Sequence, residues 1–378
     1  MDRAAALHDA CRAGSLAAVE QLFAAGLTVE EVRSQDSRAL RTACRKGRLA
    51  VVERLFEAGL TAADARAWDN EALRDACAHG HIGVVDRLFA RNPATPAFHG
   101  LTADDARAHN NYALQWACLN GLLAVVERLF EVGLTAADAR TYDNDALRHA
   151  CGQGHLAVVS RLFEAGLTAD DARAFNNWAL QRACARGHLA VVERLFARNP
   201  ATPAFQGLTE EDARADNNLA LRSASQHGHA AVVARLFDAG LTAEDARTSN
   251  NEALRFACAN GHVEVIARLF EAGLTAEDAR AGNNEPLRAA CHNGRVEAIE
   301  EMLIRGATPT ARALEAVAKG GDPERLRQVA QAVREHWAGT PELEAAESSF
   351  EEAASAAAAA VAAWATAMRT PGGLRFAD

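Results

Sequence analysis

Eight cysteines recur along the chain at nearly constant intervals. They stand at positions 11, 44, 77, 118, 151, 184, 258 and 291, so their spacings are 33, 33, 41, 33, 33, 74 and 33 residues. The spacing of 74 is the sum of 41 and 33 if Ser225 fills a cysteine position. A fixed period of this length indicates a repeat array, in which each repeat packs only on its neighbours. We therefore expect one elongated array in place of two or three independent globular domains.

Each repeat reads as two short helices, as the segment NNEALRFACANGHVEVIARLFEAGLTAEDARA at residues 250–281 shows. Its first apolar positions fall at helical spacing and end at a glycine stop signal: Leu254, Ala257 and Cys258, then Gly261. A second apolar face follows and also ends at a glycine: Val263, Ile266, Leu269 and Phe270, then Gly273. Neither helix could bury its apolar face alone, so the stacking of repeats must supply the core. Only 6% of the residues are aromatic, so Ala, Leu and Val must form most of that core.

A GLTxxDAR segment follows each second helix. A threonine followed three residues later by an acidic residue is a capping-box pattern. It predicts a third, single-turn helix at each of these positions: Thr61, Thr102, Thr135, Thr168, Thr209, Thr242 and Thr275. An Asn or Asp pair comes next, for example Asn176 and Asn177, and we expect it to cap the following helix. These asparagines are therefore predicted to be structural.

This frame resembles the ankyrin repeat, which has a 33-residue period, a GHxxVVxxL second helix and a glycine before the connecting finger. The corresponding segments here include GHLAVVERLF, GHAAVVARLF and GHVEVIARLF, and the resemblance covers residues 4–335. It implies an all-α solenoid of nine to ten repeats. The family's TPLH is replaced by ALR or ALQ, and its Gly-Ala-Asp finger opening by Gly-Leu-Thr, so we expect a short helical turn in place of a β-hairpin. Similar variants occur in ankyrin arrays of protists and large DNA viruses.

The predicted domain organisation has two parts. The solenoid spans residues 1–338, with an N-terminal cap at 4–26 and a degenerate C-terminal cap at 310–338, and an Ala-rich helical tail spans 339–378. Two loops, RNPATPAFHG and RNPATPAFQG, each add eight residues to the period and lengthen every third repeat, so the array reads as a three-repeat block copied in tandem. Phe98 and Phe205 in these loops either form a second contact edge or pack beneath the loop.

Charge and composition limit the classes of partner. The net charge of −10 and the pI near 5.7 argue against a general affinity for nucleic acid or for an anionic membrane. The opening MDRAAALHDACRAG lacks an apolar stretch, so we do not expect a signal peptide. The longest apolar run, residues 353–368, is shorter than the roughly 20 residues of a membrane span and is interpreted as a soluble helix. We expect a reducing, cytoplasmic location, with the nucleus left open.

The cysteines and histidines favour structural roles. Stacked helices lie about 8–10 Å apart, whereas a disulfide requires Cα atoms within roughly 7 Å, so Cys is predicted to fill a small buried position. The segment CAHGH imitates a metal motif, but its Cys77 should face the core while its His79 faces solvent, so we expect no metal. Five histidines follow the turn glycine and are expected to brace that turn: His81, His155, His188, His229 and His262. The sequence assembles no nucleophile with a base and an orienting acid, so we expect no enzymatic activity and no cofactor.

Arginines recur in two columns. The first column comprises Arg33, Arg66, Arg107, Arg140, Arg173, Arg214, Arg247 and Arg280. The second comprises Arg41, Arg74, Arg148, Arg222, Arg255 and Arg288, with Gln115 and Gln181 in two other repeats. Such columns would suit either a groove that tracks nucleic-acid phosphates or a network that bridges neighbouring repeats. Because acidic residues recur together with the arginines, we favour the network.

Other positions vary freely while the frame stays constant. In NNYALQWACLNG the core positions are Leu114, Ala117 and Cys118, so Tyr112 and Trp116 lie on the opposite side of the helix. A third variable position precedes the Asn pair in each repeat. Trp, Tyr and Arg are typical of protein-binding hot spots, and they gather at these positions in the middle repeats. The candidate partner-binding residues are Trp68, His109, Tyr112, Trp116, Tyr142, His149, Phe175, Trp178 and Arg182.

The sequence thus predicts a non-enzymatic scaffold that binds a protein partner through the concave groove of repeats three to six. The alternative interpretation is that each aromatic ring folds back over a neighbouring repeat and only fills the concave surface, without a role in binding. An adaptor or effector that couples the groove to a second partner through the tail is the alternative function. A nucleic-acid-binding solenoid is less favoured, and it would require unpaired arginine columns.

Overall fold

The described part of the chain is helical. The computed structural model describes residues 3–90, 98–197 and 206–308, and within these residues it contains no β-strand. The predicted all-α fold is therefore confirmed. The chain divides into two compact bodies: residues 1–183 with 190–208, and residues 184–189 with 209–378. The predicted C-terminal cap at 310–338, the tail at 339–378 and the apolar run at 353–368 lie outside the described residues.

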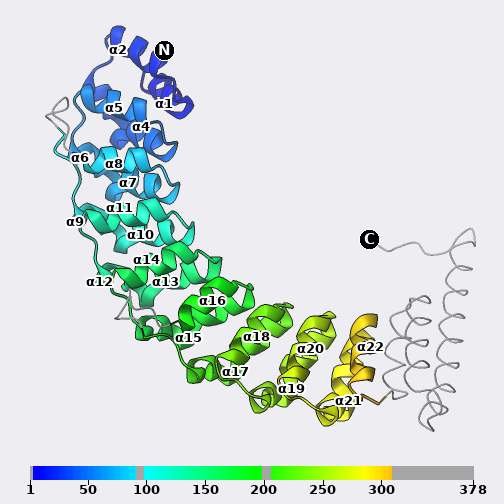
Figure 1. The fold of residues 1–378 in the computed structure, drawn as a ribbon. Coiled ribbons are helices and arrows are strands. Elements are labelled where there is room, and N and C mark those ends of the chain that lie inside the picture. Colours follow the sequence, from blue (N-terminus) through cyan, green and yellow to red (C-terminus); the bar gives the residue numbers. More distant parts are fainter. Residues whose placement is uncertain (1–2, 91–97, 198–205, 309–378) are drawn as a thin grey trace, which may run out of the picture. The chain divides into compact units, whose positions relative to one another are not determined.

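In the first body, each repeat contributes a first helix and a second helix (Figure 1). The first helices are α1 (Arg3–Ala13), α4 (Ser34–Arg45), α7 (Ala67–Ala78), α10 (Ala108–Leu119), α13 (Thr141–Gln153) and most of α15 (Ala169–Ala185). The second helices are α2 (Leu16–Ala24), α5 (Leu49–Glu57), α8 (Ile82–Phe89), α11 (Leu123–Glu131), α14 (Leu156–Glu164) and most of α16 (Leu189–Phe196). First helices contact one another in chain order from α1 to α13, as do second helices from α2 to α14.

The second body repeats this arrangement. Its helices are α17 (Glu210–Gln226), α18 (Ala230–Asp238), α19 (Ala243–Asn260), α20 (Val263–Glu271), α21 (Ala276–His292) and α22 (Val296–Ile304). Helices α17, α19 and α21 contact one another in chain order, as do α18, α20 and α22. Among the described residues, no helix combines the length and the apolar composition needed to cross a bilayer.

The core consists of small and branched side chains at the predicted positions. In α10, Leu114, Ala117 and Cys118 are all fully buried, and the second helix α11 contributes Val126 and Leu129. All eight cysteines are buried free thiols, and Ser225 is equally buried. The prediction that Cys fills a small core position, which another small residue can also occupy, is confirmed.

The GLTxxDAR segments form the predicted single-turn helices. In the first body these include α6 (Ala62–Ala65), α9 (Ala103–Ala106) and α12 (Ala136–Ala139), and the related segment GLTVEEVR of the first repeat forms a similar turn, α3 (Val29–Val32). Each begins with a capping box: at α12, the Thr135 backbone N–H and hydroxyl both donate to Asp138 Oδ2, at 2.8 and 3.1 Å. The predicted helical turn is confirmed, and a finger hairpin is absent from the described residues.

The link from this turn to the next first helix differs from the prediction. Three consecutive residues there adopt left-handed backbone angles, with φ between about 53° and 63°, and this recurs eight times in the described residues. The third residue is a buried Asn in most repeats. In six of these repeats the side-chain oxygen of this Asn, for example Oδ1 of Asn177, is buried and has no hydrogen-bond partner among the described residues. The prediction that the Asn pair caps the following helix is therefore wrong at Asn177, because the pair forms a left-handed turn instead.

A histidine braces the turn between the two helices of the preceding repeat. His155 Nε2 donates to the Leu119 carbonyl oxygen at 3.0 Å, and His81 donates to the Arg45 carbonyl oxygen at the same distance. The predicted bracing role is confirmed at these residues, although each histidine braces the repeat before its own. A Cβ atom on Gly121, whose φ is +69°, would lie 2.5 Å from His155 Nδ1. The turn therefore needs glycine both for its backbone angle and for the space.

The aromatic residue of the first insertion is buried. Phe98 is only 1% exposed, its ring centroid lies 4.1 Å from that of Phe56, and the Arg87 guanidinium lies over it. A second contact edge at Phe98 is therefore wrong, and the alternative of packing beneath the loop is right. Phe205 lies outside the described residues.

Candidate functional site

The variable position before the Asn pair displays large side chains in the middle repeats. Trp68, Tyr142 and Phe175 are 63%, 58% and 64% exposed, and His109 is exposed as well. All four hold the first place of the left-handed turn, with φ between 53° and 58°. Bulky residues rarely adopt this conformation, which costs a non-glycine residue roughly 1–2 kcal/mol. Core packing does not require these rings, because the same position holds Asp216, Ser249 and Gly282 in later repeats.

A first group of rings lies on α10. The ring centroids of Tyr112 and Trp116 are 5.4 Å apart, and the edge of His109 meets Tyr112 at 5.7 Å. The guanidinium of Arg74, from α7 in the preceding repeat, lies 5.2 Å from the centre of the Tyr112 ring. Trp116 is 37% exposed, whereas Tyr112 is half-buried. Trp116 and His109 are therefore the accessible rings of this group.

A second group joins α13 to α15. The guanidinium of Arg148 lies 5.1 Å from the Phe175 ring and 5.2 Å from the Trp178 ring. Arg182 lies 5.1 Å from the same indole, so two cations flank Trp178. His149 meets Trp178 edge-on at 6.4 Å, and its Nε2 lies 3.2 Å from Asp145 Oδ1. The predicted pair of Trp178 and Arg182 is therefore present.

Tyr142 and Trp68 each bond to the preceding repeat. Asn110 Nδ2 donates to the Tyr142 hydroxyl at 2.7 Å, and Trp68 Nε1 donates to Asp36 Oδ2 at 3.0 Å. The guanidinium of Arg41 lies 4.8 Å from the Trp68 indole. These bonds hold the polar edges of the rings, while most of each ring stays exposed. The nine candidate residues, Trp68, His109, Tyr112, Trp116, Tyr142, His149, Phe175, Trp178 and Arg182, form what we term the aromatic surface.

The second arginine column links neighbouring repeats, and its place beside the rings was not foreseen from the sequence. Five members donate to carbonyl oxygens of the left-handed turn in their own repeat, as Arg148 does to Tyr142 at 3.1 Å: Arg41, Arg74, Arg148, Arg222 and Arg288. Five members also meet an acidic or aromatic side chain at a variable position of the next repeat: Arg41 meets Glu71, Arg74 meets Tyr112, Arg148 meets Trp178, Arg222 meets Glu252 and Arg255 meets Glu285. Gln115 and Gln181 keep only the bond to the turn, to Asn110 and Asn176. The sequence held a signal for these contacts, because the facing variable position of the next repeat is acidic or aromatic for five arginines of the column: Glu71, Tyr112, Trp178, Glu252 and Glu285.

The first arginine column pairs with the capping carboxylates. Arg107 Nε donates to Asp138 Oδ1 of the next repeat at 2.8 Å, and its Nη2 donates to the Gly133 carbonyl oxygen at 2.9 Å. The same pattern joins Arg33 to Asp64, Arg66 to Asp105, Arg140 to Asp171, Arg214 to Asp245 and Arg247 to Asp278. Burial acts to raise the pKa of Asp138, but hydrogen bonds from Arg107 and Thr135 outweigh it and hold the pKa below its usual value. The predicted network between repeats is confirmed at these pairs.

Burial governs the chemistry of the thiols. It raises the pKa of the Cys11 thiol to about 12, and it raises the pKa of the other seven thiols as well. Thiols held neutral in the core are poor nucleophiles and poor metal ligands. Among the residues that the structure describes, no three His, Cys, Asp or Glu side chains are grouped so that they could hold a metal ion.

Comparison with known proteins finds similarity to ankyrin repeats. A family model described as ankyrin repeats (3 copies) matches residues 7–98 and 221–313. A comparison with curated proteins gives no match. Among solved structures, the chain is similar to the crystal structure of the human ASB11 ankyrin repeat domain, with 21% sequence identity and a TM-score of 0.44. That alignment covers 63% of this chain and 99% of the ASB11 domain.

Proposed function

Because this chain belongs to the ankyrin-repeat family, whose repeats are generally protein–protein interaction modules, we propose that it is a non-enzymatic scaffold that binds another protein. The proposed contact region is the aromatic surface of repeats three to six. On this proposal Trp68, Trp116, Tyr142 and Phe175 are the accessible anchors, and Trp178 is an anchor flanked by two cations. His109, His149 and Arg182 are the polar partners.

One observation carries this proposal: three large side chains are mostly exposed on left-handed backbone. Trp68, Tyr142 and Phe175 gain little from burial there, and the backbone angle disfavours their residue type. Side chains retained against local stability are typical of functional positions. Exposed Trp and Tyr beside Arg also match the composition of binding hot spots.

The chemistry of the surface indicates what it would bind. Arg148 and Arg182 flank the Trp178 ring, and Arg74 lies over Tyr112, so cations and apolar rings alternate. A partner segment that presents apolar side chains together with acidic groups would complement both. We therefore propose an acidic, partly apolar segment as the bound element.

The test replaces two rings together. We expect Trp116→Ala with Trp178→Ala to reduce partner capture from a lysate by about 30-fold or more, because truncating hot-spot residues costs about 2 kcal/mol or more in binding. The circular dichroism spectrum should stay unchanged, and the free energy of unfolding should fall by only about 1–2 kcal/mol, from the lost cation–π contacts of Trp178. Affinity capture followed by mass spectrometry, with urea unfolding in parallel, measures both.

Leu156→Ala is the matched control, because Leu156 is 39% exposed but lies on the second helix α14, outside the aromatic surface. It should capture the partner as the unmodified protein does. Capture by the double variant at the level of this control would contradict the proposal. A collapse of its helical signal would mean that the two rings belong to the core.

The two other functions differ in their support. The adaptor alternative depends on residues 339–378, which lie outside the described residues, and deleting them should remove one partner and spare the other. A nucleic-acid-binding function has less support, since the described arginine columns pair with carboxylates, rings and carbonyls of neighbouring repeats. A gel shift at physiological salt with steep salt dependence would revive it.

A further inference from the structure

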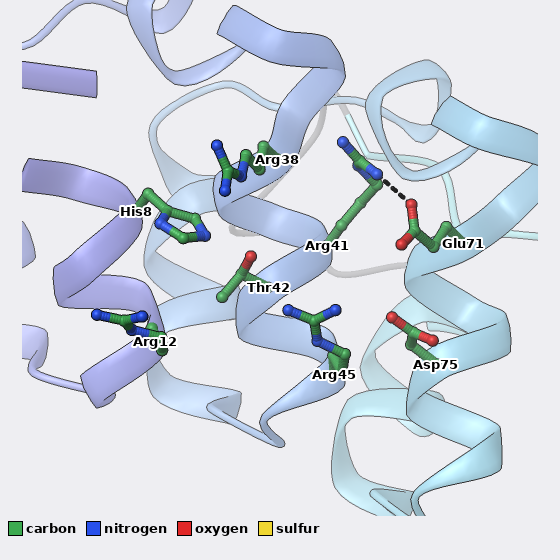
Figure 2. A pocket seen from close by; sticks show the side chains of 8 residues that line it. All are labelled: His8, Arg12, Arg38, Arg41, Thr42, Arg45, Glu71 and Asp75. Carbon is green, nitrogen blue, oxygen red and sulfur yellow. Dashed lines mark hydrogen bonds and ion pairs between the residues drawn. The ribbon is translucent and has the colours of Figure 1, made fainter. Parts of the chain in front are cut away.

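An open pocket lies at the N-terminal end of the first body, on the first three repeats. Its volume is about 300 Å³, and helices α1, α4 and α7 form its walls. Figure 2 shows that the side chains on α1 and α4 are cationic or neutral and that the two acids, Glu71 and Asp75, come from α7. Four guanidinium groups line it, those of Arg12, Arg38, Arg41 and Arg45. Four cations against two carboxylates make this a positive site on a chain whose net charge is −10.

The repeat frame does not require these cations. Arg12 and Arg45 directly follow the core cysteines of the first two repeats. The residue after the cysteine position in the later repeats is Ala78, Leu119, Gly152, Ala185, Gln226, Ala259 and His292. Arg38 and Thr42 occupy the two variable positions that hold Tyr112 and Trp116 in the fourth repeat. The pocket therefore lies at the same helix positions as the aromatic surface, with donor groups in place of rings.

Several donors in the pocket are available to a ligand. Arg45 forms no ion pair with the described residues, and Arg12 is paired only to the exposed Asp9, at 3.1 Å. Thr42 is 3% exposed, and its hydroxyl faces the pocket and makes no hydrogen bond within the described part of the chain (Figure 2). Arg41 is already engaged with Glu71. The donor side of the pocket is therefore formed by α1 and α4: Arg12, Arg38, Arg45, Thr42 and His8.

A histidine in the wall responds to the excess of positive charge. Burial lowers the pKa of His8, and the positive charges of Arg38, Arg12 and Arg45 lower it further against the opposing charge of Asp9. His8 is therefore neutral at pH 7.5 and can donate through one ring nitrogen only. An anion bound among these arginines would raise the pKa of His8, so this residue is a built-in reporter of occupancy.

We propose that this pocket binds a phosphate monoester dianion carried by a phosphorylated side chain of the protein partner. Guanidinium forks and a buried threonine hydroxyl match the oxygens of a phosphate group. The four guanidinium groups of the lining outnumber its two carboxylates, and Arg45 has no ion-pair partner among the described residues, so the pocket favours a doubly charged anion over a single carboxylate. Arg41 borders the pocket and lies over Trp68, so one partner segment can reach both regions. The source of the phosphate rests on the proposed function, whereas phosphate binding itself does not.

The first experiment titrates the full chain with inorganic phosphate and, separately, with an N-acetylated phosphothreonine amide. The C–H signals of His8 are followed by NMR at pH 7.5 and constant ionic strength, with His8→Gln providing the assignment. We expect a saturable shift and a raised pKa of His8 with both probes. A response no larger than that to sodium chloride, or one that does not saturate, would overturn phosphate binding.

Matched variants separate a built site from general attraction. Arg45→Gln and Thr42→Val should each weaken phosphate binding by about ten-fold, because each removes one hydrogen bond to the charged oxygens. Lys46→Gln removes the same charge at an exposed residue that does not line the pocket, and it should leave affinity nearly unchanged. Asp75→Asn removes a facing acid and should strengthen binding. Equal losses for Arg45→Gln and Lys46→Gln would overturn the proposal.

A second experiment tests the source. Phosphatase treatment of the captured partner should lower its capture by the unmodified protein to the level seen with Arg45→Gln, and should not lower capture by Arg45→Gln any further. Capture that is insensitive to phosphatase would overturn the partner as the source. The variant with Trp116→Ala and Trp178→Ala should still bind the phosphothreonine amide, so loss of the aromatic surface and loss of the pocket are measured independently.

Discussion

A left-handed backbone distinguishes the variable position before the Asn pair, which holds Trp68, Tyr142 and Phe175, from other surface positions of the array. The first residue of each turn has a positive φ whatever its identity, from Gln35 and Trp68 to Gly282. The repeat structure therefore sets this backbone angle, and the angle does not depend on which side chain stands at that position. Asn and Asp, which tolerate this conformation better than other non-glycine residues, fill the second position of every described turn: Asp36, Asp69, Asn110, Asp143, Asn176, Asn217, Asn250 and Asn283.

This backbone angle predicts that glycine at position 175 gives a more stable protein than alanine, the reverse of the usual order in a helix. Phe175→Gly and Phe175→Ala both remove the ring and its contact with Arg148, but only glycine is relieved of the steric conflict at φ of 58°. We expect the glycine variant to be more stable than the alanine variant by about 1 kcal/mol. An ordinary exposed helical position gives the opposite order by a similar amount. Urea unfolding of the two variants decides it, and greater stability of the alanine variant would show that the turn is not left-handed.

Two residues of the aromatic surface show what sequence reasoning could and could not reach. Trp116 was found because the core positions of its helix are fixed by the repeat, which leaves its face to solvent. Arg148 was assigned only to a column, because its position between Phe175 and Trp178 depends on how one repeat stacks on the next. Phe98 was ambiguous for the same reason, since a loop residue reveals neither its partner Phe56 nor its burial.

At the scale of the element, the single-turn helices α6, α9 and α12 are each completed by the repeat before them. The carboxylate that closes the capping box also accepts from the preceding arginine, as Asp138 does from Thr135 and Arg107. Sequence predicted these elements well, because the Thr and Asp of a capping box are local. It missed the left-handed turn that follows, since an Asn pair suits both a helix cap and a positive φ. The pocket on α1, α4 and α7 was also missed, because its residues come from three repeats.

The double role of the capping carboxylate gives a test with an internal control. Asp138→Asn should lower the free energy of unfolding by about 2 kcal/mol, since it weakens charged hydrogen bonds at a mostly buried group. Asp104→Asn removes another partner of Arg107, but the Asp104 side chain is 91% exposed, so the loss should stay below about 0.5 kcal/mol. Chemical denaturation measures both, and equal losses would contradict the structural role of the capping pair.

The turn between the paired helices allows a second test. Gly121→Ala would bring a Cβ atom against the His155 ring, whereas Gly26→Ala, at a φ of +85°, meets nothing within 4 Å. Both suffer from the positive φ, so we expect Gly26→Ala to lose about 1 kcal/mol and Gly121→Ala clearly more. Adding His155→Ala to Gly121→Ala should recover part of the excess in a double-mutant cycle. Additive losses would show that the ring does not fill this space.

At the scale of the whole molecule, acid should weaken the array in two steps. The pKa of His229 is lowered by burial, so the unfolded chain binds its proton first, and stability that is complete above pH 6.5 falls as the pH drops below that value. His8 acts in the same direction. The pKa values of Asp105, Asp171 and Asp278 lie below 3.8 in the folded chain, so their stabilisation is lost as the pH falls below that range.

Urea unfolding at pH 8, 7, 6, 5, 4 and 3 tests this profile. We expect a first decline between pH 7 and 5 and a second, steeper decline below pH 4. His229→Gln should reduce the first decline and leave the second in place. A stability that stays constant from pH 8 to pH 5 would show that the buried histidines are not held neutral by the fold.

The second arginine column has a consequence for how such arrays diversify. Arg74 and Arg148 pack against an aromatic ring of the next repeat, whereas Arg41, Arg222 and Arg255 pair with a carboxylate there. An arginine at this position therefore suits two kinds of neighbour. A duplicated repeat can therefore be placed next to a different repeat and keep the contact made by this arginine. The side chain at the variable position then changes the surface that a partner would contact. New binding specificities can arise by recombining whole repeats, without any change in the packing contacts between them.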